Sequence, residues 1–158
     1  MTGKLDHKDI NILRKLKADS RTPLSVIGDS MGASKATVSR RVTRMEDEGI
    51  ISNYSVNIDL SSSGVMKSLM MMQISGTISQ VTEQLKEYKE IGNIYKTFGD
   101  HNLMCEVYTR SVDELYQMIQ EKILKIMSVR NVEVDVIIDS TTFNGNADID
   151  LYEELNKE

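Results

Sequence analysis

The stretch that decides the fold of the first half of the chain is residues 22–49, TPLSVIGDSMGASKATVSRRVTRMEDEG. Pro23 suits the first position of a helix, and Gly32 can end that helix by adopting the left-handed conformation. Only Ala33 separates Gly32 from Ser34, a favourable N-cap for a second helix, which Gly49 can end. Two helices joined by so short a turn predict a helix-turn-helix.

Positive charge is concentrated in the second of these helices. Residues 34–44 hold four Lys or Arg and no acid, whereas the whole chain has a net charge of -5. The first 60 residues carry ten Lys/Arg against eight Asp/Glu, and the remaining 98 carry nine against sixteen. Arginine can fork onto guanine edges or phosphates, and a helix N-terminus attracts phosphate. The asymmetry indicates that the two halves do different work and that the first half meets DNA.

In a helix over 35–48, Val38, Val42 and Met45 recur at helical spacing and are expected to face inward. The alternative for the cations is a solvated charged face, but the acid-free run and the tight turn before it favour DNA. We expect Thr37, Arg40 and Arg41 to read bases, and Lys35 and Arg44 to contact phosphate. The full set of DNA-contact candidates is Ser34, Lys35, Thr37, Ser39, Arg40, Arg41 and Arg44.

The flanking segments extend this reading in both directions. Residues 5–20 predict a helix with Asp6 as N-cap and an apolar side built from Leu5, Ile12, Leu13 and Leu16. Residues 51–60, ISNYSVNIDL, alternate and are rich in β-branched side chains, which predicts an extended strand. SSSG at 61–64 then marks a boundary.

The second half changes period. Alternating or apolar runs predict strands, and runs with apolar side chains at helical spacing predict helices. Their order is strand, helix, strand, strand, helix, strand, which is the ferredoxin-like βαββαβ arrangement. The six segments are 65–76, 79–91, 93–99, 102–109, 111–127 and 132–140. In the last strand Val132, Val134, Val136 and Ile138 are expected on one face. Residues 143–158 are acidic and can end in a short helix over 148–158.

The chain resembles the Lrp/AsnC family of prokaryotic transcription regulators. The residues that carry the resemblance are LDHKDINIL at 5–13, the run from Leu24 to Tyr54, VNIDLSSSG at 56–64 and FGDHNLMCEVY at 98–108. The resemblance implies an α+β chain with a winged helix-turn-helix and then a ferredoxin-like effector and dimerisation domain. The expected parts are the DNA-binding domain at 1–52, a linker strand at 53–64, the effector domain at 65–142 and the acidic tail at 143–158.

The resemblance also implies assembly. Family members pack two sheets face to face as homodimers, which often join into tetramers or octamers. A two-fold dimer would read a pseudo-palindromic operator in double-stranded DNA, with half-sites about one helical turn apart or a multiple of that. VMKSLMMMQI at 65–74 is apolar on both faces. A partner sheet would explain this, and so would a core strand in a monomer, and the sequence leaves the two open.

An amino acid or related metabolite is the effector that the resemblance implies, bound between subunits. Carried over by position, the binding residues are Gly99, Asp100, His101, Asn102, Ser140, Thr141 and Thr142. Asp100 could pair with an ammonium group. His101 and Asn102 replace the aromatic and acidic residues more usual in that turn. The other interpretation, equally weighted, is that GDHN is a plain hairpin turn.

Other functional classes fit the sequence less well. Two histidines and one cysteine are too few for a structural zinc site, and no nucleophile elbow, phosphate-binding glycine loop or paired-carboxylate motif is present. We therefore expect no enzyme activity, no metal and no cofactor beyond the effector. No apolar run is long enough for a membrane span, and the single cysteine suits the cytoplasm. The remaining alternative is a metabolite-sensing or assembly protein without specific DNA binding.

Overall fold

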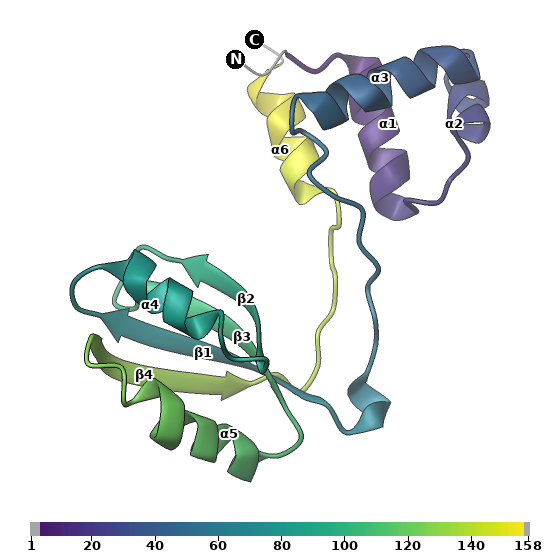
Figure 1. The fold of residues 1–158 in the computed structure, drawn as a ribbon. Coiled ribbons are helices and arrows are strands. Elements are labelled where there is room, and N and C mark those ends of the chain that lie inside the picture. Colours follow the sequence, from purple (N-terminus) through teal and green to yellow (C-terminus); the bar gives the residue numbers. More distant parts are fainter. Residues whose placement is uncertain (1–3, 157–158) are drawn as a thin grey trace. The chain divides into compact units, whose positions relative to one another are not determined.

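The computed structural model describes residues 4–156 and divides them into two compact units (Figure 1). The first unit contains the residues up to 57 together with those from 141 onward, and the second contains 58–140. The chain therefore passes between the units twice, once after residue 57 and once after residue 140. The acidic C-terminal segment, expected as a separate tail, belongs to the compact unit formed by the N-terminal helices.

The first unit is built from helices α1 (His7–Ala18), α2 (Leu24–Ser30), α3 (Lys35–Asp47) and α6 (Ala147–Leu155). Asp6 caps α1 as expected, in a capping box with Asp9. The core of the unit consists of apolar side chains from the first three helices, namely Ile12, Leu16, Ile27, Val38, Val42 and Met45. The inward face expected for α3 is thereby confirmed, because its three apolar residues are all buried.

The turn between α2 and α3 is tight because two backbones approach closely. Gly28 O accepts from the amide of Ala33 at 2.9 Å. A Cβ at position 28 would lie 2.4 Å from the carbonyl oxygen of Ala33, so only glycine fits there. Gly32 has a φ of 63°, which gives the expected left-handed end of α2. Ser34 then accepts from the amide of Thr37 at 3.1 Å and caps α3 as expected.

The strand expected at 51–60 does not form. These residues, all described by the structure, contain no strand, and 52–60 are exposed throughout. Val56 and Ile58 are 84% and 68% exposed. Alternation favours an extended backbone, but a strand also needs a neighbouring strand for its amides and carbonyls, and no strand among residues 4–156 pairs with this segment.

The second unit confirms the βαββαβ order. Its elements are β1 (Met66–Ile74), α4 (Ile78–Leu85), β2 (Ile91–Lys96), β3 (Leu103–Thr109), α5 (Val112–Met118) and β4 (Val129–Val136). The four antiparallel strands lie in the order β2-β3-β1-β4. Met70 and Met72 of β1 pack with Val81 and Leu85 of α4 and with Leu115 of α5. Both helices therefore cover the same face of the sheet, and the other face is left open.

Both helices and the last strand of this unit end earlier than expected. The helix expected at 79–91 ends at Leu85. The helix expected at 111–127 is α-helical only to Met118 and continues as a π-helical turn over Ile119–Ile123. β4 ends at Val136, because the register of β1 and β4 runs only from Ser68 opposite Val136 toward the end of β1. Ile138, expected on the packed face of that strand, is 98% exposed. One further backbone bond, from the Ile137 amide to Lys67 O at 2.9 Å, joins the two strands beyond Val136, but the apolar pattern runs on to Ile138 and therefore overestimated where the strand ends.

Candidate nucleic-acid interface and effector site

Helix α3 presents its polar side away from the core of the first unit. Lys35 and Arg40 are exposed, and neither makes a hydrogen bond or ion pair in the described part of the chain. Thr43 lies three residues after Arg40, on the same exposed side, and had not been selected from the sequence. The hydroxyls of Ser34 and Thr37 are 2.9 Å apart at the helix start, and this one hydrogen bond leaves further bonding capacity on the Thr37 hydroxyl. The free cations of the helix are therefore Lys35 and Arg40.

Arg41 and Arg44 do not share this freedom, because both bind the carboxylate of Asp9 on α1. Asp9 is fully buried, with 0% of its surface exposed. Its two oxygens accept from Arg41 Nη1 at 2.8 Å and from Arg44 Nη2 at 2.7 Å. Arg41 Nη1 also donates to Asp6 at 2.7 Å. The hydrogen bonds that Arg41 donates to Asp9 and then to Asp6 raise the pKa of Arg41.

The acidic side of the network is equally tied to helix α1. Burial disfavours the charged form of Asp6, but hydrogen bonds from the Asp9 amide and from Arg41 outweigh burial and lower the pKa of Asp6. In the other direction, the Asp6 amide donates to Asp9 Oδ2 at 3.0 Å. One buried carboxylate thus joins the start of α1 to the middle of α3. Sequence reasoning missed Asp9, although its place three residues after an N-cap acid was a usable signal.

The turn expected to hold an effector is organised around Asn102. Its side-chain amide donates to the carbonyl of Ile74 at 2.8 Å and accepts from the amide of Ile74 at 2.7 Å. Its own backbone amide donates to Met72 O at 3.1 Å. Asn102 therefore extends the pairing of β3 with β1, and its polar groups are already occupied. Gly99 has a φ of 153°, at the margin of the left-handed region.

Asp100 and His101, the neighbouring residues of the turn, differ in whether their side chains already have an interaction partner. Asp100 is exposed and makes no hydrogen bond or ion pair among the described residues. His101 is mostly buried, and its Nε2 lies 3.5 Å from Glu133 Oε1 on β4. Its carbonyl accepts from the Thr97 hydroxyl at 2.5 Å. Asp100 is thus the one side chain of the turn that is both charged and unengaged within the described chain.

The two groups of effector candidates are not brought together within one chain. The 99–102 turn lies beside Met72 and Ile74, at the end of β1. Ser140 follows Val136, which pairs with Ser68 near the start of β1. The two groups are therefore attached at opposite ends of the central strand. A site that used both would need residues from two subunits.

The open face of the sheet carries a polar cluster among apolar side chains. Glu106 accepts from Lys67 Nζ at 2.9 Å and Asn93 Nδ2 at 2.8 Å, and from the hydroxyls of Tyr95 and Tyr108 at 3.3 Å. Burial raises the pKa of Glu106, but the bonds from Asn93 and Lys67 outweigh it and lower the pKa. The cluster is surrounded on this face by the half-buried residues Leu69, Met71 and Met104.

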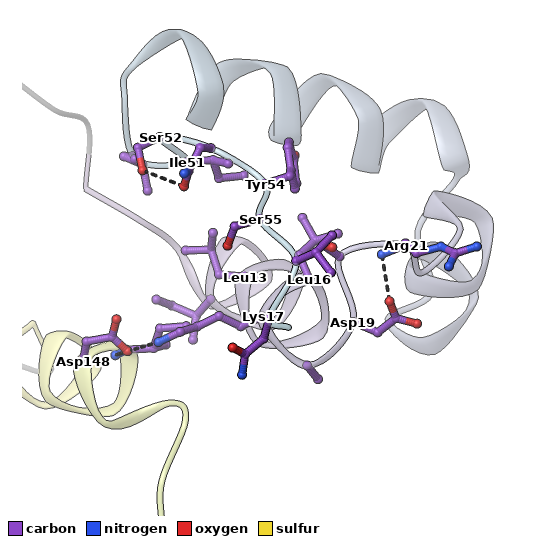
Figure 2. A pocket seen from close by; sticks show the side chains of 18 of the residues that line it. Leu13, Leu16, Lys17, Asp19, Arg21, Ile51, Ser52, Tyr54, Ser55 and Asp148 are labelled. Carbon is purple, nitrogen blue, oxygen red and sulfur yellow. Dashed lines mark hydrogen bonds and ion pairs between the residues drawn. The ribbon is translucent and has the colours of Figure 1, made fainter. Parts of the chain in front are cut away.

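A cavity of about 710 Å³ lies in the first unit between α1, the segment after α3, and α6 (Figure 2). Leu13, Leu16, Ile51 and Tyr54 supply apolar surface on one side, and Lys17 meets Asp148 of α6 on the other. None of the effector candidates, all of them described, borders this cavity. No orphaned buried polar atom of the described residues points to a ligand there.

Residues 4–156 contain neither a metal-binding cluster nor a membrane-spanning helix. No group of three or more His, Cys, Asp or Glu side chains in this range is placed to hold a metal ion. No helix in the same range is long and apolar enough to cross a membrane. The remaining candidates are the exposed side of α3 and the second unit with its open sheet face.

Both units match known family models. Residues 5–52 match a winged helix-turn-helix DNA-binding family, and residues 69–146 match the Lrp/AsnC ligand binding domain. The transcriptional regulator LrpA of Pyrococcus horikoshii is 31% identical over 141 residues, which cover 85% of this chain and 97% of LrpA. The regulatory protein AsnC of Haemophilus influenzae is 28% identical over 132 residues, covering 82% and 88%.

Solved structures share the fold of both units. AsnC of E. coli superposes with a TM-score of 0.76 at 22% identity, covering 89% of this chain and 96% of AsnC. A transcriptional regulator of Neisseria meningitidis, solved with L-methionine, superposes with a TM-score of 0.79 at 16% identity, covering 92% and 99%. Together with the LrpA relationship, these matches show that the chain is a member of the Lrp/AsnC family of helix-turn-helix transcription regulators.

Proposed function

We propose that the protein is a sequence-specific DNA-binding regulator whose helix α3 enters the major groove. The observation that carries the proposal is the free cationic side of α3, in a helix-turn-helix unit whose core holds that helix rigidly from behind. Arg40 and Lys35 have no partner among the described residues, so they can engage DNA without first losing an ion pair.

Within the DNA-contact set, we propose different roles from those suggested by charge alone. Arg40 and Thr37 read base edges, with Thr43 and Ser39 beside them on the helix. Lys35 and the N-terminal amides near Ser34 meet phosphate. Arg41 and Arg44 act chiefly through Asp9, because one terminal nitrogen of each, Arg41 Nη1 and Arg44 Nη2, is committed to that carboxylate. Any contact that they make with the phosphate backbone would use the other terminal nitrogen of each guanidinium.

Selection of bound fragments from genomic DNA, followed by affinity measurements on the recovered operator, tests the proposal. Arg40→Ala is expected to lose about 1–3 kcal/mol of binding free energy and to relax sequence preference at one position of each half-site. Lys125→Ala, an exposed cation of the second unit, is the matched control and should leave binding unchanged. Equal affinity of the Arg40 variant and the control would refute the role of Arg40.

We further propose that a small metabolite, with an amino acid as the first choice, binds the second unit and alters DNA binding. Support comes from the match to a ligand binding domain, and two neighbours in fold, from N. meningitidis and M. tuberculosis, were solved with L-methionine. Asp100 would meet the ammonium group, and Ser140, Thr141 and Thr142 of a second subunit would meet the carboxylate. Asn102 and His101 shape the turn rather than touch the ligand.

Calorimetry with each of the twenty amino acids tests this part of the proposal. We expect heat from at least one of them, and we expect Asp100→Asn to weaken that binding while Asp113→Asn, an exposed acid of α5, does not. If none of the twenty amino acids produces heat or changes the elution volume, the amino-acid effector is excluded. DNA binding would then stand on its own measurement.

The proposed assembly is a homodimer, or a larger oligomer such as an octamer, in the cytoplasm and without catalytic activity. The open sheet face supports the dimer, because Leu69, Met71 and Met104 lie there only half-buried. The exposed apolar side chains of 54–60 support it as well, since an extended segment without a partner strand can pair with a second copy. Sedimentation analysis of the full chain distinguishes these states.

A further inference from the structure

Helix α6 lies beyond the end of the match to the ligand-binding family, which stops at residue 146. It nevertheless packs on α1 of the DNA-binding unit (Figure 1). Resting on the DNA-binding function proposed above, we infer that α6 is an autoinhibitory helix. Its carboxylates hold cations of α1 that would otherwise be available to DNA phosphates.

The contact between the two helices is built on charge. Arg14 Nη2 donates to Asp150 Oδ1 and to Glu153 Oε2, both at 2.8 Å. Lys17 pairs with Asp148 at the other end of the contact. A carboxylate pair around an arginine satisfies the same N–H groups that a DNA phosphate would engage. Two cations of α1, Arg14 and Lys17, are therefore occupied by acids of the same chain.

Apolar and neutral contacts give α6 a defined position on α1. Ile10 and Ile149 are 3% and 8% exposed, and both border the cavity between the two helices. The Tyr152 hydroxyl accepts from the amide of Leu5 at 3.0 Å. With Ile10 between them, His7, Arg14 and Lys17 lie at helical spacing on one side of α1, opposite the side that packs on α3. This stripe, His7–Ile10–Arg14–Lys17, is the docking surface for α6.

The electrostatic effect on the DNA-binding unit is large. Residues up to 57 contain ten Lys/Arg and seven Asp/Glu, a formal charge of +3. Residues from 141 onward contain one Lys and five Asp/Glu, a formal charge of -4. Docking of α6 thus turns a cationic unit into one with a charge of -1. Because phosphate contacts dominate affinity for DNA, an acidic helix on this unit must weaken binding.

Chain connectivity gives the inhibition a route of control. Only residues 143–146 separate Thr142 from the start of α6. Ser140, Thr141 and Thr142 are the effector candidates on this side of the chain. A ligand held by these three residues would act on the segment that carries α6. If the ligand bound the form with α6 docked and the form with α6 released with different affinities, it would shift the equilibrium between the two forms.

The test uses the full chain and a mixed-sequence DNA duplex, so that it does not depend on the operator. The test variant combines Asp148→Asn, Asp150→Asn and Glu153→Gln, and the control combines Glu87→Gln, Asp113→Asn and Glu121→Gln in the second unit. Both change the total charge equally. We expect the test variant alone to bind several-fold more tightly, with a salt slope steeper by about one for each cation released. Ile149→Ser, which changes no charge, should also tighten binding by releasing α6.

Removing the cations completes the test. Arg14→Gln with Lys17→Gln should cost several-fold in affinity in the test variant and little in the unmodified chain, where α6 already occupies them. Equal affinities of the test and control variants, or an equal cost of the cation changes in both backgrounds, would overturn the inference. Circular dichroism and melting confirm that each variant is folded. Failure of the DNA-binding proposal itself shows differently, as no binding at low salt by either the unmodified chain or the test variant.

Discussion

At the scale of single residues, Asp9 matters more than any of the cations that it binds. A buried carboxylate is tolerated only when its charge and hydrogen bonds are satisfied, and Asp9 is satisfied by two arginines and a backbone amide. The positive run in 34–44 indicated DNA binding, but charge along one helix cannot show which cations another helix will capture. Only the structure, in which Arg41 and Arg44 bind Asp9, therefore separates their roles from that of Arg40.

We expect Asp9→Asn to lower the free energy of unfolding of the first unit by about 2–3 kcal/mol. Removing one member of an ion pair is most costly when both partners are buried. Arg41 and Arg44 are partly exposed, so water can solvate them after Asp9 is neutralised, and the expected cost is smaller. Urea denaturation monitored by far-UV circular dichroism measures the change. Asp29→Asn, an exposed acid of α2, is the control. If the two variants had equal midpoints, the ion network would not contribute to stability.

Cys105 gives a second residue-scale prediction. It is fully buried in β3, and this burial raises the pKa of its thiol from 9.0 to about 12. At pH 8 the folded protein should therefore react with a thiol reagent only as fast as it opens, whereas the urea-unfolded chain reacts at once. Because the folded pKa lies above the unfolded value, the related stability is complete below pH 9 and is lost as the pH rises toward 12. Rapid labelling of the native chain at pH 8 would contradict the burial.

At the scale of elements, apolar periodicity predicted the helices and strands whose partners come from this chain. The apolar runs at 65–76 and 102–109 predicted β1 and β3 correctly, because these two strands pair with each other. Alternation at 51–60 predicted a strand that does not form. Strand formation requires a neighbouring strand to pair with, and the local sequence pattern does not show whether one is available. The acidic C-terminal helix was expected, but its docking on α1 was not, because it depends on residues 131 or more positions apart.

At the turn between α2 and α3, the predicted effect of replacing glycine by alanine is opposite to what helix propensity alone would give. Alanine is the better helix former, yet a Cβ at position 28 would lie 2.4 Å from a backbone oxygen that cannot move alone. We expect Gly28→Ala to destabilise the unit by about 1–3 kcal/mol, as overpacking does, and to weaken DNA binding by moving α3. Thermal melting with Ser25→Ala as control measures this. An increase in melting temperature for Gly28→Ala would show that the approach is looser than the structure indicates.

The turn of the second unit can be tested in the same way. Asn102→Ala removes two hydrogen bonds to Ile74 and should cost about 1–3 kcal/mol, because the backbone groups of Ile74 lose their partners. Asn102→Asp keeps the acceptor but loses the donor, so its free energy of unfolding should lie between those of the unmodified chain and the alanine variant. Denaturant midpoints of the three chains give the order. An unaffected alanine variant would mean that Asn102 is free for a ligand after all.

At the scale of the whole molecule, the two units divide the work that the charge asymmetry suggested. The N-terminal unit presents Lys35 and Arg40, and the second unit presents an open sheet face and an unengaged Asp100. The chain crosses between the units twice, so a ligand or partner on the second unit has two covalent routes to the first. The family could be identified from sequence because both units carry its residues in the right order. The action of the C-terminal helix could not, because that helix lies beyond the matched residues.

The central claim is that the exposed side of α3 reads bases in the major groove. Dimethyl sulfate protection on a selected operator tests it most directly, since the reagent marks guanine N7 in the major groove and adenine N3 in the minor groove. We expect two patches of protected guanines related by a two-fold axis and separated by about one helical turn or a multiple of it, with loss of those protections in Arg40→Ala. Protection confined to minor-groove adenines, or guanine protection that persists in Arg40→Ala, would contradict the claim.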